Sequence, residues 1–117
     1  MELRSANSSR LKLWHENAKR EWIASDWSNA AAGEMGECCN AVKKLQRIRD
    51  GLFNINEEAR QLTSEDEAIK FVGKEAADTI IYLDLLLLYL GVNLDNFIVE
   101  VFNKKSEEYG FPQKLNK

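Results

Sequence analysis

Apolar residues recur every three or four positions along most of the chain, which is the spacing of a helix with one buried face. Four stretches follow this spacing, and no stretch reads as a strand. The first helix should begin at a cap provided by Ser8 or Ser9 and end near Ser25. Its apolar side carries Leu11, Trp14, Ala18, Trp22 and Ile23. Four helical stretches joined mostly by short turns predict an all-α protein folded as a four-helix bundle.

The second helix should begin at a cap at Asp26 or Ser28 and run to about Arg49. Its last turn carries arginines, which suit the negative end of the helix dipole, and the pair Asp50-Gly51 can close it. Residues 51–62 show no clean period and are expected to form a connecting loop.

The third helix opens with two overlapping capping-box patterns, in which Thr63 pairs with Asp66 and Ser64 pairs with Glu67. Glycine is the usual residue just beyond a helix, so this helix should stop at Gly91.

The second half of the third helix, Ile80–Leu90, is apolar nearly all round. A monomeric bundle of this size would struggle to cover such a helix on every side. We therefore expect a second copy of the chain to cover it, in a homodimer or homotetramer. The alternative is that this is simply the most central helix of the fold.

The fourth helix can be capped by Asn93 and should end at Tyr109-Gly110, with Pro112 just beyond. Its apolar stripe consists of Leu94, Phe97, Ile98, Val101 and Phe102, and Lys105 continues it.

Chain length, net charge and composition limit the classes of protein to which this chain can belong. A chain of 117 residues has the length of one domain, so residues 1–117 are assigned to a single domain. A net charge of -3 offers no basic field for nucleic-acid binding. The longest strongly apolar run, Leu85–Leu90, is far below the roughly 20 residues of a membrane span, and we expect a cytoplasmic protein. Cys38 and Cys39 are adjacent on a helix, where their side chains diverge, so both are expected to be reduced core residues.

Two pairs of acids lie on faces that otherwise carry apolar residues: Glu34 with Glu37, and Glu75 with Asp78. With 19 acids in the chain, a spacing of three is common by chance, so the inference depends on the apolar surroundings. Four converging carboxylates repel one another unless they bind protons or a cation. Because a site made only of oxygen ligands selects hard ions, we expect Mg²⁺, with Mn²⁺ as an alternative.

Gly33 and Gly36 flank the first acid pair, and each glycine inside a helix costs about 1 kcal/mol relative to alanine. Close approach of another backbone or of a bulky ligand would account for this cost. Tight packing between helices is the simpler alternative.

Mg²⁺ that is held by carboxylates and keeps several waters suits the binding and cleavage of polyphosphates. Basic residues should then hold the phosphates. The polar candidates are Lys44, Asn103, Lys104 and Lys105, although each lysine could equally be a solvated surface residue. Aromatic residues that could stack on a base, or could instead fill the core, are Trp22, Trp27 and Tyr82.

At residues 26–115 the sequence resembles the MazG-like all-α nucleoside triphosphate pyrophosphohydrolases. The resemblance rests on Glu-x-x-Glu and Glu-x-x-Asp motifs on successive helices, together with flanking residues. The matching segments are Gly33–Glu37, Asn40, Lys43-Lys44, Glu75–Asp78, Tyr82, Phe102–Ser106 and Tyr109–Pro112.

This resemblance implies a Mg²⁺-dependent enzyme that hydrolyses nucleoside or deoxynucleoside triphosphates between the α and β phosphates. The products would be the monophosphate and pyrophosphate, the assembly a dimer or tetramer, and the role nucleotide-pool house-cleaning. It further implies that the catalytic residues and metal ligands are Glu34, Glu37, Glu75 and Asp78.

The resemblance also places a lysine of the last helix near the phosphates. Val101 stands at that place in this chain, so Lys104 or Lys105 is assigned the contact instead. The competing interpretation is a non-catalytic helical interaction module, in which the acids pair with Lys44, Lys74 or Arg47.

Overall fold

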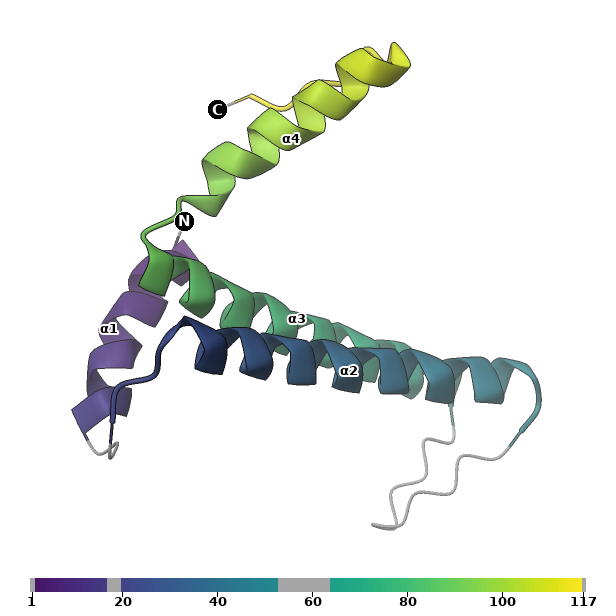
Figure 1. Cartoon of the computed structure of the whole chain (residues 1–117). Coiled ribbons are helices and arrows are strands. Elements are labelled where there is room, and N and C mark those ends of the chain that lie inside the picture. Colours follow the sequence, from purple (N-terminus) through teal and green to yellow (C-terminus); the bar gives the residue numbers. More distant parts are fainter. Residues whose placement is uncertain (1, 17–19, 53–63, 117) are drawn as a thin grey trace. The chain divides into compact units, whose positions relative to one another are not determined.

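A computed structural model describes residues 2–16, 20–52 and 64–116 of the chain. Within these ranges the chain forms four helices and no strand (Figure 1). The helices are α1 Glu2–Glu16, α2 Ala24–Arg49, α3 Glu65–Leu90 and α4 Leu94–Tyr109. The predicted all-α class is confirmed, whereas the bundle arrangement and the assembly into an oligomer stay predictions.

The contacts of the chain group into two compact units. One unit is the segment Trp22–Leu83, which holds α2 and most of α3. The other combines Met1–Glu21 with Asp84–Lys117 and holds α1, the end of α3 and α4. The assignment of the whole chain to a single domain stays a prediction.

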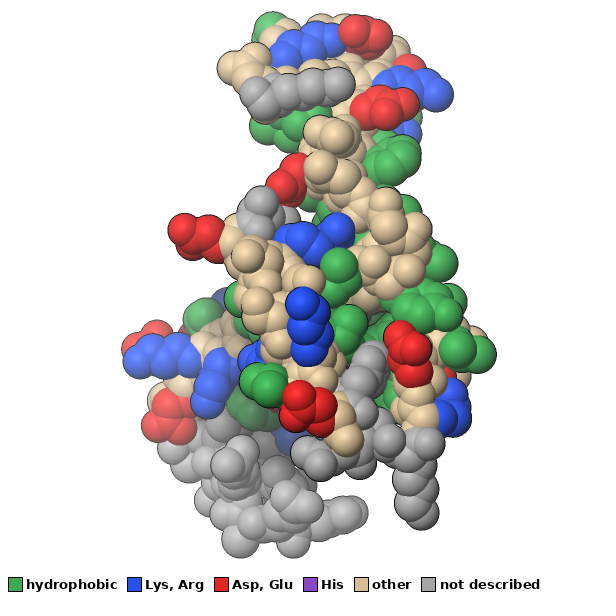
Figure 2. Space-filling view, turned by 90° about the vertical axis from the view of Figure 1, so that its left-hand side faces the viewer, with side chains coloured by type: hydrophobic (Ala, Val, Ile, Leu, Met, Phe, Trp, Pro, Cys, Tyr) green, Lys and Arg blue, Asp and Glu red, His purple; other side chains and the backbone are tan. Residues whose placement is uncertain are grey.

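Basic and acidic side chains are interspersed on the face of the chain that Figure 2 shows. In the part of the chain that the structure describes, no single helix has the length and hydropathy of a membrane span. Only α3 and α4 taken together, as a bent pair, reach those values.

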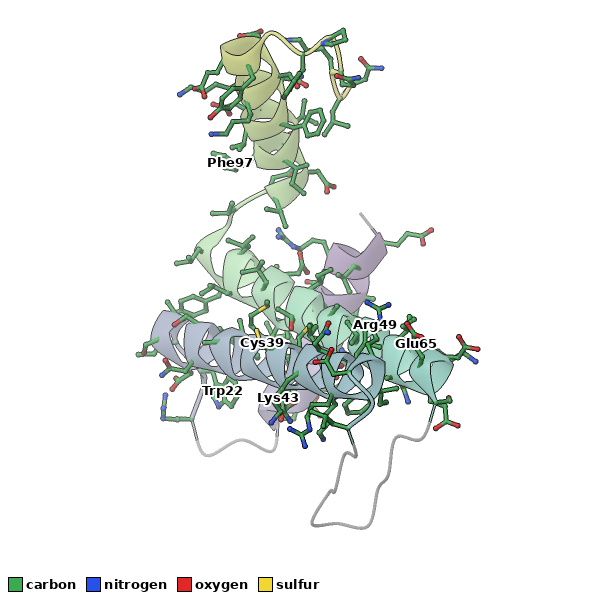
Figure 3. The ribbon with its side chains drawn as sticks, turned by 90° about the vertical axis from the view of Figure 1, so that its right-hand side faces the viewer. Trp22, Cys39, Lys43, Arg49, Glu65 and Phe97 are labelled. Atoms are coloured by element: carbon green, nitrogen blue, oxygen red, sulfur yellow. The ribbon has the colours of Figure 1, made fainter. Side chains whose placement is uncertain are left out.

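In the first unit α2 and α3 lie side by side as an antiparallel hairpin (Figures 1 and 3). Arg49, the last residue of α2, donates from Nε to Oε1 of Glu65, the first residue of α3, over 2.6 Å. At the opposite end of the hairpin, the ring centroids of Trp27 and Tyr82 are 6.4 Å apart. These two contacts show which ends of α2 and α3 lie against each other.

The core of this unit follows one stripe of α2. Its buried residues are Trp27, Ala31, Cys38 and Ala41. Because they are spaced by three, four or seven positions, they lie on one side of the helix. Cys39, next to Cys38, is exposed, and both thiols are free, so only one of the two cysteines is the core residue that was expected.

The helix ends confirm the predicted glycine stops. At the end of α3, Gly91 N–H donates to Leu88 C=O over 3.1 Å and Val92 N–H donates to Leu87 C=O over 2.8 Å. This is the Schellman pattern, which needs a left-handed backbone just past the helix. Left-handed glycines with φ near 70° follow three of the helices: Gly51, Gly91 and Gly110.

The predicted start of α3 is also confirmed, because Ser64 Oγ accepts a hydrogen bond from Glu67 N–H over 3.1 Å. Thr63 and residues 53–62 of the expected loop lie outside the described residues. Asn93 occupies the position before α4, as predicted, but its side chain makes no capping hydrogen bond.

The expected bounds of the first helix are wrong. α1 begins at Glu2, ahead of Ser8 and Ser9, and it ends at Glu16 rather than near Ser25. The residues before Ser8 offer little apolar periodicity, and this part of α1 instead makes polar contacts to α3.

Those contacts converge on Asp84, a buried acid within the apolar run of α3. Arg4 Nε donates to Asp84 Oδ1 over 3.0 Å, and Asn7 Nδ2 donates to Asp84 Oδ2 over 2.9 Å. Asn7 and Asp84 are 1% and 2% exposed. Buried polar groups that satisfy one another in this way hold the first two turns of α1 against the end of α3.

The start of α2 differs from both expected caps, Asp26 and Ser28. The Asp26 carboxylate accepts a hydrogen bond from Ile23 N–H over 2.9 Å, which satisfies a donor at the helix start from inside the helix. α2 therefore begins at Ala24. Trp22 precedes it and does not belong to the first helix.

Candidate metal centre

Three of the four predicted metal ligands meet between α2 and α3. One carboxylate oxygen from each of Glu34, Glu37 and Glu75 can be chosen so that all three lie within 4.8 Å of one another. The antiparallel hairpin brings the acids together from opposite parts of the sequence, because it pairs the middle of α2 with the middle of α3.

The position of Glu34 follows from the core stripe of α2. It lies three residues after Ala31 and four before Cys38, so it occupies a place where the neighbouring turns are buried. Glu34 and Glu75 are accordingly half-buried, as the sequence predicted.

Glu37 and Asp78 are exposed, so the expectation that all four acids face inward is wrong for these two. A step of three residues turns the helix by about 300°, which leaves the second acid of each pair about 60° away from the first. The second acid therefore lies at the edge of the interhelical face and reaches solvent.

Glu75 carries a buried oxygen, Oε2, without a hydrogen-bond donor among the described residues. A buried acceptor without a donor costs about 1–3 kcal/mol, and more when the group is charged. A cation or a proton at this position would remove that cost.

The negative charges of the cluster also act on one another. Burial, followed by the charge of Glu37, raises the pKa of the Glu34 carboxyl above its ordinary value. Burial, followed by the charges of Glu37 and Asp78, raises the pKa of Glu75, while Lys74 lowers it. Asp78 thus lies near enough to contribute charge, although it is not one of the three converging acids.

These observations fit a divalent cation bound by oxygen ligands. Three carboxylates converge, one of their oxygens is buried without a donor, and two of the groups resist ionisation in their present surroundings. Mg²⁺ and Mn²⁺ prefer such ligands to nitrogen or sulfur. The structure therefore contains a candidate metal centre formed by Glu34, Glu37 and Glu75, with Asp78 beside it.

Gly33 and Gly36 do not mark a close contact within the chain. A Cβ atom built at either residue would meet no atom within 4 Å, and both residues are exposed. The tight helix packing considered above therefore does not explain these glycines, and no described backbone approaches them.

The predicted aromatic residues form one cluster at the end of the hairpin. The rings of Trp22 and Trp27 are 4.6 Å apart between centroids, and Tyr82 lies beyond Trp27. Trp27 is only 1% exposed and belongs to the core. Trp22 and Tyr82 are half-buried, so each keeps some accessible surface.

The lysines that were predicted to hold the phosphates lie in both units. Lys44, on α2, lies with its Nζ 5.9 Å from the centre of the Phe71 ring of α3. Lys105, on α4, has its Nζ 3.8 Å from Glu108 Oε2 and 5.7 Å from the centre of the Tyr109 ring. Lys104, on the same helix, is exposed.

Asn103 has a local role. Its Oδ1 accepts a hydrogen bond from Leu115 N–H over 2.7 Å, and its Nδ2 donates to Leu115 C=O over 2.9 Å. Lys114 reinforces this arrangement by donating to Glu107 Oε1 over 3.0 Å. The amide that was expected to contact substrate thus holds the C-terminal segment against α4.

Among the described residues, Asp84 is a buried acid that the sequence did not single out. Its signal was present, because it is an aspartate followed directly by Leu85–Leu88. What could not be read from the sequence was its pairing with Arg4 and Asn7, which lie about 80 residues away.

The chain was compared with protein-family models, with curated proteins and with solved structures, and none of them matches it.

Proposed function

We propose that this protein is a Mg²⁺-dependent hydrolase of nucleoside or deoxynucleoside triphosphates, of the MazG-like all-α type. It cleaves between the α and β phosphates and releases the monophosphate and pyrophosphate. The observation that carries the proposal is the convergence of Glu34, Glu37 and Glu75, one of which buries an oxygen that has no donor among the described residues.

In this proposal Glu34, Glu37 and Glu75 hold the metal, and Asp78 completes the set. A divalent ion bound there would neutralise part of the triphosphate charge and polarise the α phosphorus. Glu37 is the exposed member of the converging group, so its carboxylate is available to orient the attacking water and accept a proton from it.

Lysines and aromatic residues would position the substrate. Lys44, on α2, is the candidate for the phosphates within the unit that holds the acids, and Lys104 or Lys105 stays the candidate that the resemblance assigns. Tyr82 lies one turn beyond Asp78 on α3, and this position supports assigning it a contact with the nucleoside. Trp22, the more accessible of the two tryptophans, is the better candidate for stacking on the base.

The same proposal includes a cytoplasmic location, assembly as a homodimer or homotetramer, and a house-cleaning role that removes surplus or non-standard nucleotides.

The test is a pyrophosphate-release assay over a panel of nucleoside and deoxynucleoside triphosphates with Mg²⁺. Activity should appear with at least one substrate and be lost in Glu37→Gln and in Asp78→Asn. Glu67→Gln and Asp66→Asn are matched controls, because these acids are exposed in the first turn of α3 and lie outside the converging group. Full activity in both test variants would contradict the proposal.

A non-catalytic helical interaction module is the second candidate function. The observation that favours it is the number of large apolar side chains that remain exposed on α4. The panel assay separates the two functions, since an interaction module releases no pyrophosphate from any triphosphate.

A further inference from the structure

The α2–α3 hairpin differs chemically at its two ends, and the converging acids lie between them. At one end the rings of Trp27 and Tyr82 meet, and the ring of Trp22 lies 4.6 Å from that of Trp27 between centroids. All basic residues of α2 follow Glu37, and all those of α3 precede Glu75. They are Lys43, Lys44, Arg47, Arg49, Lys70 and Lys74. The hairpin therefore runs from an aromatic end, past the acids, to a basic end.

Lys44 lies on the same side of the hairpin as the exposed acids of the cluster. It follows Glu37 by about two turns, so both side chains leave α2 in nearly the same direction. Phe71 precedes Asp78 by the same interval on α3. The Lys44 Nζ atom is 5.9 Å from the centre of the Phe71 ring, which is the range of a cation–π contact. The ammonium group is therefore held against α3 on the side where the exposed acids reach solvent.

The order of these groups along the hairpin matches the order of groups in a nucleoside triphosphate. With a rise of about 1.5 Å per residue, Lys44 lies about 10 Å beyond Glu37 on α2, and Phe71 lies about 6 Å beyond Glu75 on α3. In the opposite direction, Tyr82 lies one turn from Asp78. An extended triphosphate presents its base, its α phosphate and its two leaving phosphates in the same sequence.

We propose that the centre binds the triphosphate in one direction, with the nucleoside at the aromatic end and the leaving pyrophosphate beside Lys44. Phe71 is then a positioning residue, because it holds the Lys44 ammonium in place. This inference rests on the proposed function and adds the direction of the substrate to it. The opposite direction would set the leaving phosphates against the aromatic rings, at an end where α2 and α3 offer no cation.

This direction places a positive charge where negative charge develops during the reaction. Water forms the new bond to the α phosphorus and gives its proton to Glu37. The bond from that phosphorus to the bridging oxygen breaks, and the electron pair leaves with the pyrophosphate. The Lys44 ammonium would stabilise this leaving group, whereas it would not reach the phosphate of the monophosphate product.

The test compares the binding of the two products by calorimetry with Mg²⁺ present. The ligands are inorganic pyrophosphate and the nucleoside monophosphate from the most active triphosphate of the panel. Lys44→Met should weaken pyrophosphate binding at least about 10-fold, because it removes a charged hydrogen-bond donor, and change monophosphate binding less than about twofold. Phe71→Leu should weaken pyrophosphate binding about threefold, and Phe71→Tyr, which keeps a ring, should restore the wild-type affinity.

Lys43→Met is the matched control. It removes the same charge from the adjacent residue, which is exposed and leaves α2 about 100° away from Lys44. Its affinities for both products should equal those of the wild type.

Three results in an active enzyme would overturn the direction and leave the proposed function intact. They are an equal loss of affinity for both products in Lys44→Met, an unchanged pyrophosphate affinity in that variant, and a wild type that does not bind pyrophosphate. Failure of the proposed function is a different result, in which the wild type releases no pyrophosphate from any triphosphate of the panel. The inferred direction would then be overturned with it.

Discussion

At the scale of single residues, the candidate centre depends on two glutamates whose ionised form is destabilised by their surroundings. Burial and neighbouring negative charge both oppose ionisation of Glu34 and Glu75. The sequence could identify these residues, because acids on an apolar face are visible as a pattern. It could not show which acid of each pair is exposed, because that depends on which side of the pair the neighbouring helix covers.

Glu75→Gln should stabilise the protein in the absence of divalent ions. At neutral pH the neutral amide removes repulsion from Glu37 and Asp78, and we expect the free energy of unfolding to rise by about 0.5–1 kcal/mol. Denaturant unfolding in the presence of a chelator measures this difference. Glu67→Gln, an exposed change on the same helix, should alter it by less than about 0.5 kcal/mol. A marked loss of stability in Glu75→Gln would show that the ionised carboxylate is stabilising.

The raised pKa values also predict how stability depends on pH. A folded state that binds its protons more tightly than the unfolded state gains stability at low pH. The contribution of Glu34 and Glu75 is therefore complete below the ordinary glutamate pKa and is lost as pH rises through their raised folded-state pKa values. The difference in melting temperature between wild type and Glu75→Gln, measured in chelator across this range, should move against the wild type as pH increases. The opposite slope would contradict the assigned direction.

Asp84 is expected to be the most sensitive acid for folding. Asp84→Ala leaves the donors of Arg4 and Asn7 without their acceptor at a buried site, and we expect a loss of about 3 kcal/mol in the free energy of unfolding. Chemical denaturation measures the loss. Glu100→Ala, an exposed acid on α4, serves as the control and should cost less than about 0.5 kcal/mol. Equal effects of the two substitutions would mean that the buried network contributes little.

At the scale of elements, the ends of helices were more predictable than their beginnings. A glycine stop such as Gly91 is a local property, because only the left-handed backbone it allows completes the terminal hydrogen bonds. The start of α2 was harder to predict, because Asp26 can accept a backbone hydrogen bond either as the cap before the helix or from inside its first turn. The structure shows the second arrangement. The start of α1 depends on Asp84, which is distant in sequence and gives no local signal.

The segment after α4 offers a test at this scale. Asn103→Ala removes both side-chain hydrogen bonds to Leu115. Hydrogen exchange at the Leu115 amide should become at least about 10-fold faster, because each of the two lost hydrogen bonds is worth about 1 kcal/mol and the segment can then leave α4 more often. Asn96→Ala, at an exposed asparagine on the same helix, should leave this exchange rate unchanged. Equal exchange in the wild type and Asn103→Ala would contradict the proposed clamp.

At the scale of the whole molecule, the two units have different chemical characters. The Trp22–Leu83 unit brings acids together, whereas the other unit leaves an apolar helix face exposed. The sequence predicted the acid pairs and an uncovered apolar helix, but it assigned the uncovered face to the third helix. The structure locates the more continuous exposed row on α4, because exposure depends on which neighbours a helix has and not on its own composition.

The central claim is that the converging carboxylates bind a divalent cation, and thermal unfolding across a Mg²⁺ series tests it most directly. A ligand that binds only the folded state stabilises it by RT ln(1 + [L]/Kd), which is about 1.4 kcal/mol at ten times Kd and raises the melting temperature by roughly 5 °C. The account predicts this rise in the wild type and in Glu67→Gln, and its loss in Glu75→Gln. A melting temperature that stays constant through millimolar Mg²⁺ in the wild type, or that rises equally in Glu75→Gln, would contradict it.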